Sequence, residues 1–100
     1  MEPSPLEVRR SAAFTRWIEA LRDVTARAVI NRRIDRVSLG NLGDVTPVGE
    51  GVSELRVHHG PGYRVYFVRR DERMILLLCG GDKSSQARDI SLAKALAKEG

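Results

Sequence analysis

A chain of 100 residues, 42% of them hydrophobic, can bury one core, so we expect a single domain over 1–100 with 1–5 as a frayed end. Its apolar runs are too short to cross a bilayer, and the N-terminus lacks the basic start and apolar middle of a secretory signal, which indicates a cytoplasmic protein with no membrane partner. The net charge of +4 is concentrated in residues 9–36, where eight Arg accompany three acidic residues. Such a basic helical surface either attracts nucleic acid or an acidic protein, or is a solvated helix face.

The first half of the chain predicts one strand and two helices. Residues 6–9 can form a short strand, and Ser11 suits the N-cap of a helix over 12–22. Asp23 can cap a second helix that ends at Gly40, where a glycine with a left-handed backbone would stop it. Apolar residues recur at helical spacing in both segments: Phe14, Trp17, Ile18 and Leu21, then Ala26, Val29, Ile30, Ile34 and Val37. The two helices should form an antiparallel hairpin.

From residue 44 onward the apolar residues recur with a period of two, which predicts strands. We expect them at residues 45–48, 53–58, 63–69 and 73–79, separated by glycine-rich or acidic turns. The unbroken apolar run that ends at Cys79 is typical of a central strand, so we interpret this cysteine as a core residue. A last helix should begin at Ser84 or Ser85. This order predicts a compact α+β domain with helices packed on a mainly antiparallel sheet of three or four strands.

Polar side chains of two neighbouring strands should lie on one face of the sheet. If the apolar side chains of 53–58 and 63–69 join one core, residue 58 should pair with 64 and residue 56 with 66. The turn that follows the last strand can bring a lysine to the same rim, and a glutamine three residues later is close enough to touch the same ligand. The expected site therefore contains Arg56, His58, Arg64, Tyr66, Lys83 and Gln86.

These residue types suit cleavage of RNA by transesterification, in which a ribose 2′-hydroxyl attacks the adjacent phosphorus. The reaction needs a base, an acid and cations around the phosphorane, and it requires no metal. Arg56 and Arg64 can hold phosphate oxygens through bidentate donors, and we expect Arg64→Ala to lose activity without unfolding. His58 is a candidate for the proton transfers, because histidine commonly acts as a general acid and base. Tyr66 could stack on a base or donate a proton, and Lys83 could neutralise charge or transfer a proton.

Other interpretations of these residues stay open or are rejected. The cationic face could be an ordinary solvated face on which long arginine stems cover apolar surface and pair with Glu54. The segment that ends in Lys83-Ser84 lacks the earlier glycine of a phosphate-binding loop. His58 and His59 point to opposite faces of a strand, and the chain has one cysteine, so we expect neither a zinc site nor any other cofactor.

Five segments carry a resemblance to a known family. They are F-x-x-W-I-x-x-L-x-D at 14–23, G-N-x-G-D at 40–44, V-G-x-G-V-x-E-L-R-V at 48–57, G-P-G-Y-R-V-Y-F at 60–67 and L-L-x-G-G-D-K-x-x-Q-x-x-D-I at 77–90. Together they resemble the phage-derived, HigB-like addiction-module killer proteins of the RelE/ParE toxin superfamily. The resemblance extends over about residues 14–97.

The resemblance implies a bacterial type II toxin with a RelE-like fold. Many such relatives enter the ribosomal A site and cut messenger RNA there, and an antitoxin, in this branch usually a HigA-like helix-turn-helix protein, silences them and binds promoter DNA. By this resemblance Arg64 matches the arginine that is placed on the scissile phosphate. Arg56 lies near the position of a strand lysine, and Lys83 lies near the basic residue after the last strand.

The chain departs from its relatives near the C-terminus. They often carry a tyrosine or histidine there to act on the 2′-hydroxyl, and residues 86–100 contain neither. The proton transfers then fall to His58, Tyr66 or Lys83, or catalysis depends on ribosomal RNA and charge stabilisation, or the target is different. We therefore expect a metal-independent, ribosome-dependent mRNA endoribonuclease (an mRNA interferase) that arrests growth. The alternatives are a ParE-like protein that poisons DNA gyrase without nuclease activity, and a degenerate toxin that acts only with its antitoxin in promoter repression.

Overall fold

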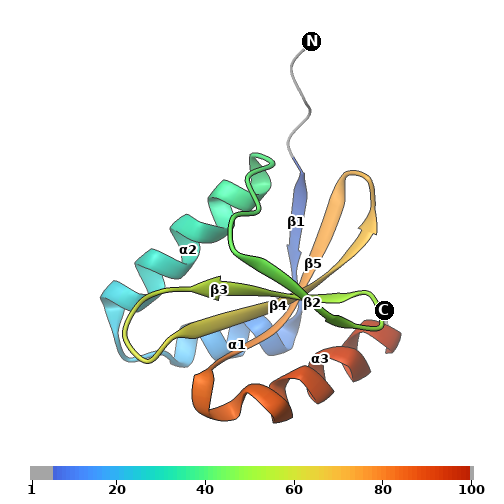
Figure 1. Ribbon diagram of the computed structural model, residues 1–100. Helices are drawn as coiled ribbons and strands as arrows, with labels where there is room; N and C mark the ends of the chain where they lie inside the picture. The colour runs from blue at the N-terminus through green and yellow to red at the C-terminus, as the bar shows by residue number, and fades with distance from the viewer. Residues whose placement is uncertain (1–5, 100) are drawn as a thin grey trace.

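The computed structural model describes residues 6–99 and contains five strands and three helices (Figure 1). In chain order they are β1 (Glu7–Arg10), α1 (Ala12–Ala20), α2 (Val24–Ser38), β2 (Val45–Gly49), β3 (Val52–Val57), β4 (Tyr63–Asp71), β5 (Met74–Asp82) and α3 (Gln86–Glu99), with a single 3₁₀ turn (Lys83–Ser85) between β5 and α3. The predicted α+β order is confirmed. The end that we expected to be frayed, residues 1–5, lies outside the described residues.

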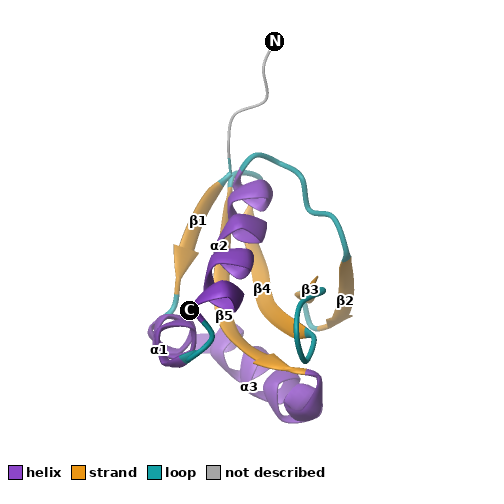
Figure 2. Cartoon of the chain, turned by 90° about the vertical axis from the view of Figure 1, so that its left-hand side faces the viewer, coloured by secondary structure: helices purple, strands orange, loops and turns teal. Residues whose placement is uncertain are grey.

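All five strands join one sheet in the order β1-β5-β4-β3-β2. The meander β2 to β5 is antiparallel throughout, and β1 adds to its far edge parallel to β5. The parallel pair is possible because both helices of the hairpin lie between β1 and the meander in the chain, which gives the long crossover that such a pair needs. Figure 2 shows the strong curvature of β4 and β5, which separate α2 from α3.

The helix ends follow from local hydrogen bonds. The Ser11 Oγ accepts from the backbone N–H of Phe14 at 3.0 Å, and the Asp23 carboxylate accepts from Ala26 at 3.1 Å, as the two predicted N-caps require. At the end of α2, Gly40 has a φ of +93° and donates to the carbonyl of Val37, which is the left-handed glycine cap that the sequence predicts. No helix of residues 6–99 is both long and apolar enough to span a membrane.

The sheet is covered by different helices on its two faces. On one face, α1 and α2 enclose the larger core, which includes Phe14, Ile18, Ala26, Ile30, Ile34, Val37, Leu55, Val57, Tyr63, Val65, Phe67, Ile75 and Leu77. On the other, α3 covers a smaller core of Val52, Tyr66, Val68, Leu78, Cys79 and Ala93. The position of Cys79 in this core confirms its interpretation as a packing residue.

The pairing of β3 with β4 differs from the prediction. Arg56 lies opposite Arg64 and Glu54 lies opposite Tyr66, so the predicted pairs of 58 with 64 and 56 with 66 are wrong by two residues. The connection is the longer of the two loops that the sequence allowed and spans residues 58–62. A shift of two residues keeps every side chain on its face, which is why the hydrophobic pattern could not exclude it.

Candidate active site

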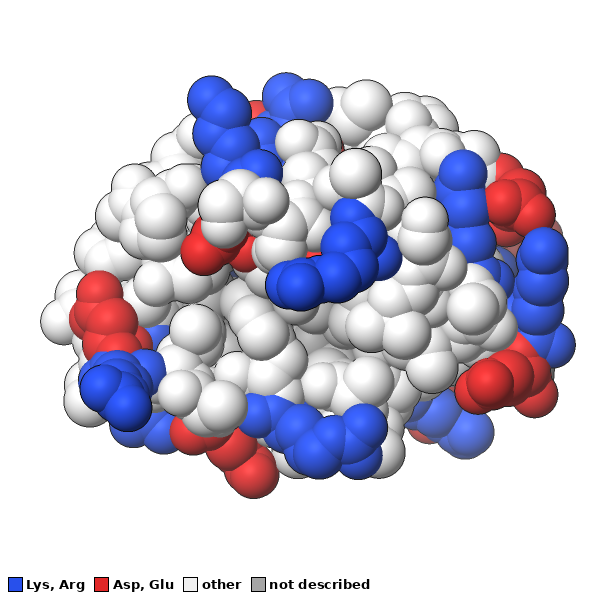
Figure 3. Space-filling view, turned by 90° about the horizontal axis from the view of Figure 1, so that it is seen from below, with Lys and Arg blue, Asp and Glu red and all other residues white. Residues whose placement is uncertain are grey.

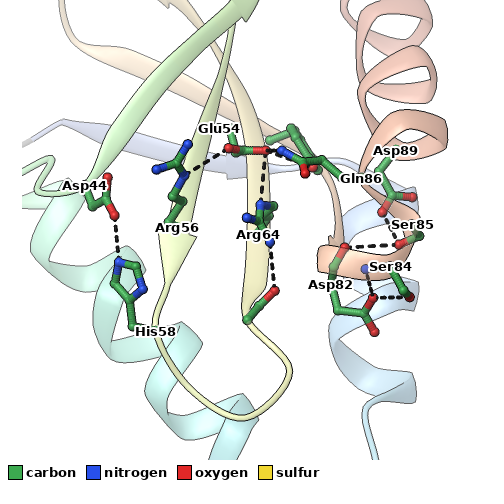
Figure 4. Close-up of polar contacts among 12 residues, drawn as sticks. Asp44, Glu54, Arg56, His58, Arg64, Asp82, Ser84, Ser85, Gln86 and Asp89 are labelled. Carbon is green, nitrogen blue, oxygen red and sulfur yellow. Dashed lines mark hydrogen bonds and ion pairs between the residues drawn. The ribbon is translucent and has the colours of Figure 1, made fainter.

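The candidate site lies on the face of the sheet that α3 covers, at the end where that helix begins (Figure 4). Three strand residues, Glu54, Arg56 and Arg64, continue the α3-facing side of β3 and β4 beyond the apolar patch. Gln86, the first residue of α3, lies beside them. We refer to Glu54, Arg56, Arg64, Tyr66 and Gln86 as the Glu54 cluster.

Glu54 is the centre of this cluster, because three hydrogen-bond donors and a second guanidinium group surround its carboxylate. The side chain is 1% exposed, and it accepts hydrogen bonds from Gln86 Nε2 at 2.8 Å, from the Tyr66 hydroxyl at 3.2 Å and from Arg56 Nε at 3.2 Å. Arg64 Nε lies 3.3 Å from its Oε1. A buried carboxylate is tolerated when it is paired in this way, and here the pairing fixes both guanidinium groups.

The two arginines leave a surplus of positive charge at the surface. Arg64 is the more enclosed, with 13% of its side chain exposed, and its Nη1 donates to the Gly62 carbonyl at 3.2 Å. Arg56 is more open, at 38%. Because one carboxylate neutralises only one of two guanidinium groups, the cluster keeps a net charge of about +1 and offers free N–H donors to an anion.

Tyr66 does not occupy the position that the sequence suggested. It lies on the predicted face, yet its side chain is fully buried and its hydroxyl donates to Glu54. Burial raises the pKa of the Tyr66 phenol well above its ordinary value, and the adjacent Glu54 carboxylate adds to the shift. The expectation that this ring stacks on a base or donates a proton at an open surface is therefore wrong, because β5 and α3 enclose it.

His58 lies apart from the Glu54 cluster. β3 ends at Val57, so His58 is the first loop residue, and its Nε2 is 2.6 Å from Asp44 Oδ2, on the far side of Arg56 from Arg64 (Figure 4). The expected convergence with Arg64 is wrong for this residue, since the five-residue loop releases it from the strand register. Its side chain is 76% exposed. Within residues 6–99, no three or more His, Cys, Asp or Glu side chains are grouped closely enough to hold a metal ion.

Lys83 lies at the rim where the sequence placed it. It is exposed, begins the 3₁₀ turn after β5, and shares a shallow pocket with Pro61 of the β3–β4 loop. The turn is held by Asp82, which accepts from the backbone and side chain of Ser84 at 2.8 and 2.5 Å. These hydrogen bonds lower the pKa of the Asp82 carboxyl below its ordinary value.

Two glycines at the end of β5 allow both helices to approach the site. A Cβ on Gly80 would overlap the Trp17 ring of α1, and a Cβ on Gly81 would overlap the Asp89 carboxylate of α3. Gly81 lies directly opposite Arg64 in the sheet. Asp89 is buried and accepts from the Ser85 hydroxyl at 2.5 Å, which joins the start of α3 to the preceding turn.

Sequence reasoning placed Arg56, Arg64, Lys83 and Gln86 near one another. In the structure Arg56, Arg64 and Gln86 meet at Glu54, whereas Lys83 lies on the turn after β5 and has no contact with them among the hydrogen bonds and ion pairs of residues 6–99. Sequence reasoning missed Glu54 as the centre of the site, although the alternation of β3 puts this residue on the same face and its pairing with arginine was considered. The available signal was that Glu54, a charged residue, lies two positions before Arg56 and so shares its otherwise apolar face of the sheet.

A family comparison identifies the chain. Residues 16–98 match the family described as "Phage derived protein Gp49-like", which is a RelE/HigB-type toxin family. The chain belongs to the Gp49-like family. This confirms the resemblance that the motifs of the sequence carry.

Two individual proteins are similar to this Gp49-like chain, one in sequence and one in structure. An uncharacterised protein of Haemophilus influenzae is 44% identical over 94 residues, which cover 94% of this chain and 95% of that protein. A chain in the crystal structure of the toxin–antitoxin complex RelBE2 from Mycobacterium tuberculosis superposes with a TM-score of 0.60 at 20% identity, covering 79% of this chain and 99% of that chain. The second similarity shows a common RelE-type fold.

Proposed function

We propose that this chain is the toxin of a type II toxin–antitoxin system and acts as a ribosome-dependent endoribonuclease that cuts messenger RNA and blocks translation. Family membership supports the toxin role. The observation that supports the reaction is the pair Arg56 and Arg64, fixed by one buried carboxylate at the open end of the sheet with positive charge in excess. Such a site is complementary to the extra negative charge of a phosphorane.

In the proposed reaction, the ribose 2′-hydroxyl attacks the adjacent phosphorus and the 5′ oxygen leaves, which forms a 2′,3′-cyclic phosphate. Arg64 donates to the non-bridging oxygens from its outer N–H groups, since its Nη1 donates to the Gly62 carbonyl and its Nε side is turned toward Glu54 in an ion pair. Arg56 binds the same or the neighbouring phosphate. Lys83, on the adjacent turn, adds positive charge near the leaving oxygen. The groups required are a base, an acid and cations, so we propose metal-independent catalysis.

The proton transfers are assigned to Lys83 or to ribosomal RNA. His58 lies on the far side of Arg56 from Arg64, where Asp44 holds its Nε2 at 2.6 Å, so its imidazole does not lie beside the phosphate that we propose on Arg64 (Figure 4). Substituting His58 by Gln should therefore leave the cleavage rate near the wild-type value. A cleavage rate lower by about 10² or more would show that the imidazole takes part in the proton transfers.

Tyr66 and Gln86 are proposed as positioning residues. Both donate to Glu54, and neither presents its donor to the open surface. Their removal should act through the orientation of Arg56 and Arg64. Tyr66→Phe and Gln86→Leu should therefore lower the cleavage rate and leave its pH profile unchanged, whereas loss of a proton donor would change that profile.

We also propose that an antitoxin, of the HigA-like helix-turn-helix type, binds this chain. The support is the RelE-type fold that it shares with a chain of a toxin–antitoxin complex. An acidic antitoxin segment could neutralise the Glu54 cluster or hold it away from the ribosome. Mixing the two proteins should abolish cleavage, and promoter DNA should bind only the complex that contains the antitoxin.

The proposed function is tested by primer extension on messenger RNA from translating ribosomes. The toxin should produce cleavage stops in the A-site codon, and the same RNA without ribosomes should remain intact. Absence of stops with intact RNA, together with loss of supercoiling by purified gyrase, would favour a ParE-like target. Absence of both effects and of growth arrest would indicate a degenerate toxin.

A further inference from the structure

A second concave surface lies on the opposite side of Arg56 from Arg64. It is a pocket of about 300 Å³ between α2 and the end of β3. We refer to it as the α2 pocket. Its lining residues are Val29, Arg32, Arg33, Arg36, Asp44, Arg56, Val57 and His58.

The spacing of residues on α2 explains one wall of this pocket. Residues 29, 32, 33 and 36 follow one another at i, i+3, i+4 and i+7, so they share one face of the helix. The outermost pair of the β2–β3 ladder is Val45 with Leu55, so residues 56–58 extend past the ladder. The arginine-bearing face of α2 lies opposite these residues. The uncovered strand end and the arginine face of α2 together form the hollow.

Positive charge dominates the α2 pocket. Four arginines line it, and Asp44 is the acidic residue among its lining residues. Burial lowers the pKa of the Arg33 guanidinium, the nearby Arg36 lowers it further, and Asp44 partly compensates. The lining thus resembles an anion-binding site, because its guanidinium groups outnumber its carboxylate and can bind an anion from outside the protein.

Three of these charged groups are already engaged, Arg56 with Glu54 among them. The side chains of Arg32 and Arg36 form no hydrogen bond or ion pair within residues 6–99. Arg33 donates through Nη2 to the carbonyl of Leu42, and Asp44 is held by His58 at 2.6 Å. Arg32 and Arg36 are exposed on the helix. Their guanidinium groups can turn into the hollow toward a ligand, above an apolar floor made by Val29 and Val57.

Arg56 joins the α2 pocket to the Glu54 cluster. It lines the pocket and also donates to Glu54, and it lies directly opposite Arg64 across the β3–β4 pair. Arg56 therefore connects the cationic groups of α2 with Arg64 on β4. A nucleic-acid backbone, with its regularly spaced phosphates, can contact several of these cations at once, whereas a single anion would contact only one or two of them.

We propose that the α2 pocket binds a backbone phosphate of the single-stranded RNA whose scissile phosphate lies on Arg64. The pocket combines guanidinium walls with an apolar floor, which suits a phosphate together with its sugar. An acidic peptide would use the same charges but gains nothing from their continuity with Arg64. The inference rests on the proposed function in one respect, namely that the strand at Arg64 is RNA.

The test measures binding of a short fluorescent 2′-O-methyl oligoribonucleotide by anisotropy over a range of salt concentrations. The 2′-O-methyl group blocks the attacking hydroxyl, so binding is read without cleavage or ribosomes. The pocket variant is Arg32→Gln/Arg36→Gln. The matched control is Arg9→Gln/Arg73→Gln, which removes the same charge from exposed residues at the other end of the sheet.

The pocket variant should bind the oligonucleotide about tenfold more weakly than the control, and its plot of log affinity against log salt should be shallower by about 0.7, the value for one phosphate contact. Equal affinity and slope for the two variants would overturn the proposal, as would no binding by the wild type at low salt. A loss confined to a polyglutamate peptide would identify an acidic-protein site instead. Inorganic phosphate that competes as well as the strand would identify a free-phosphate site.

These outcomes are separate from those of the proposed function. A wild-type protein that fails to cut messenger RNA on ribosomes can still show the difference between the two variants. Conversely, a protein that cuts normally while both variants bind equally retains its proposed activity and loses only the α2 pocket as part of the RNA path.

Discussion

Glu54 separates two arginines that would otherwise repel each other across adjacent strands. Arg56 and Arg64 are directly opposed in the β3–β4 pair, an arrangement that destabilises a sheet when the charges are alike. The buried carboxylate lies 3.2 Å from one and 3.3 Å from the other. The residue that makes the site possible is therefore an acidic residue, although the ligand that we propose is itself an anion.

Removal of Arg64 should cost stability as well as activity. The sequence suggested an exposed arginine that contributes little to the core, which is wrong because its side chain is 13% exposed and pairs with buried Glu54. Arg64→Ala should lower the free energy of unfolding by about 1–3 kcal/mol, since Glu54 loses an ion pair but keeps its three hydrogen-bond donors. Urea denaturation measures the change. A variant as stable as the wild type would show that the ion pair contributes nothing.

Stability should fall at alkaline pH because of two buried groups. Burial raises the pKa of the Tyr66 phenol, and it raises the pKa of the Cys79 thiol to about 12, with a further contribution from Asp89. In the unfolded chain these groups ionise near 10.0 and 9.0. The folded state keeps these protons to a higher pH than the unfolded chain does. The contribution of the two groups to the free energy of unfolding is therefore complete below pH 9 and is lost as the pH rises toward about 12.

Urea midpoints measured at about pH 8 and about pH 10.5 test this dependence. Tyr66→Phe/Cys79→Ala is expected to be less stable at pH 8, because it loses a hydrogen bond and a packed sulfur, but to change less between the two pH values. If the double variant shows the same decline as the wild type, other groups cause it.

At the scale of elements, the pair Gly80-Gly81 determines how closely α1 and α3 approach β5. Each glycine faces a different helix, and each leaves no room for a side chain. Gly81→Ala should destabilise the protein by about 1–3 kcal/mol, because α3 has to shift with Asp89. Asp89→Ala removes the overlapping carboxylate, so the double variant should be more stable than the sum of the two single changes predicts. Additive changes in thermal denaturation would contradict this contact.

Elements with local signals could be predicted from the sequence, and long-range features could not. Ser11, Asp23 and Gly40 act as caps because each satisfies backbone groups a few residues away. The loop at 58–62 was ambiguous, because loops of three and five residues keep the same faces. The burial of Tyr66 depends on where β5 and α3 cross it, which no local pattern records.

At the scale of the whole molecule, the two faces of the sheet differ in how they are covered. One face packs its larger core against the helical hairpin, whereas the other is covered by α3 where its side chains are apolar. Figure 3 shows the α3 side, where Lys and Arg stand apart from one another among uncharged and acidic surface. On this side, the RNA recognition that we propose therefore depends on the specific arrangement around Arg56 and Arg64 and not on a continuous basic surface (Figure 3).

The candidate site was predictable in part for the same reason. Alternation along β3 and β4 indicated that Arg56 and Arg64 share a face, and the turn after β5 indicated the place of Lys83. The pairing of His58 with Asp44 joins residues that are 14 positions apart through a tertiary contact, and no local pattern predicts such a contact.

The most direct measurement is the single-turnover rate of messenger RNA cleavage on translating ribosomes for Arg64→Lys, with Arg73→Lys as the matched control. The lysine keeps the charge and the pairing with Glu54 but loses the planar fork that would hold two phosphate oxygens. For Arg64→Lys we predict a cleavage rate at least about 10²-fold lower than that of the wild type. The control should cleave at nearly the wild-type rate, and the two variants should have similar stability. Cleavage by Arg64→Lys at the wild-type rate would contradict the role of this arginine at the scissile phosphate.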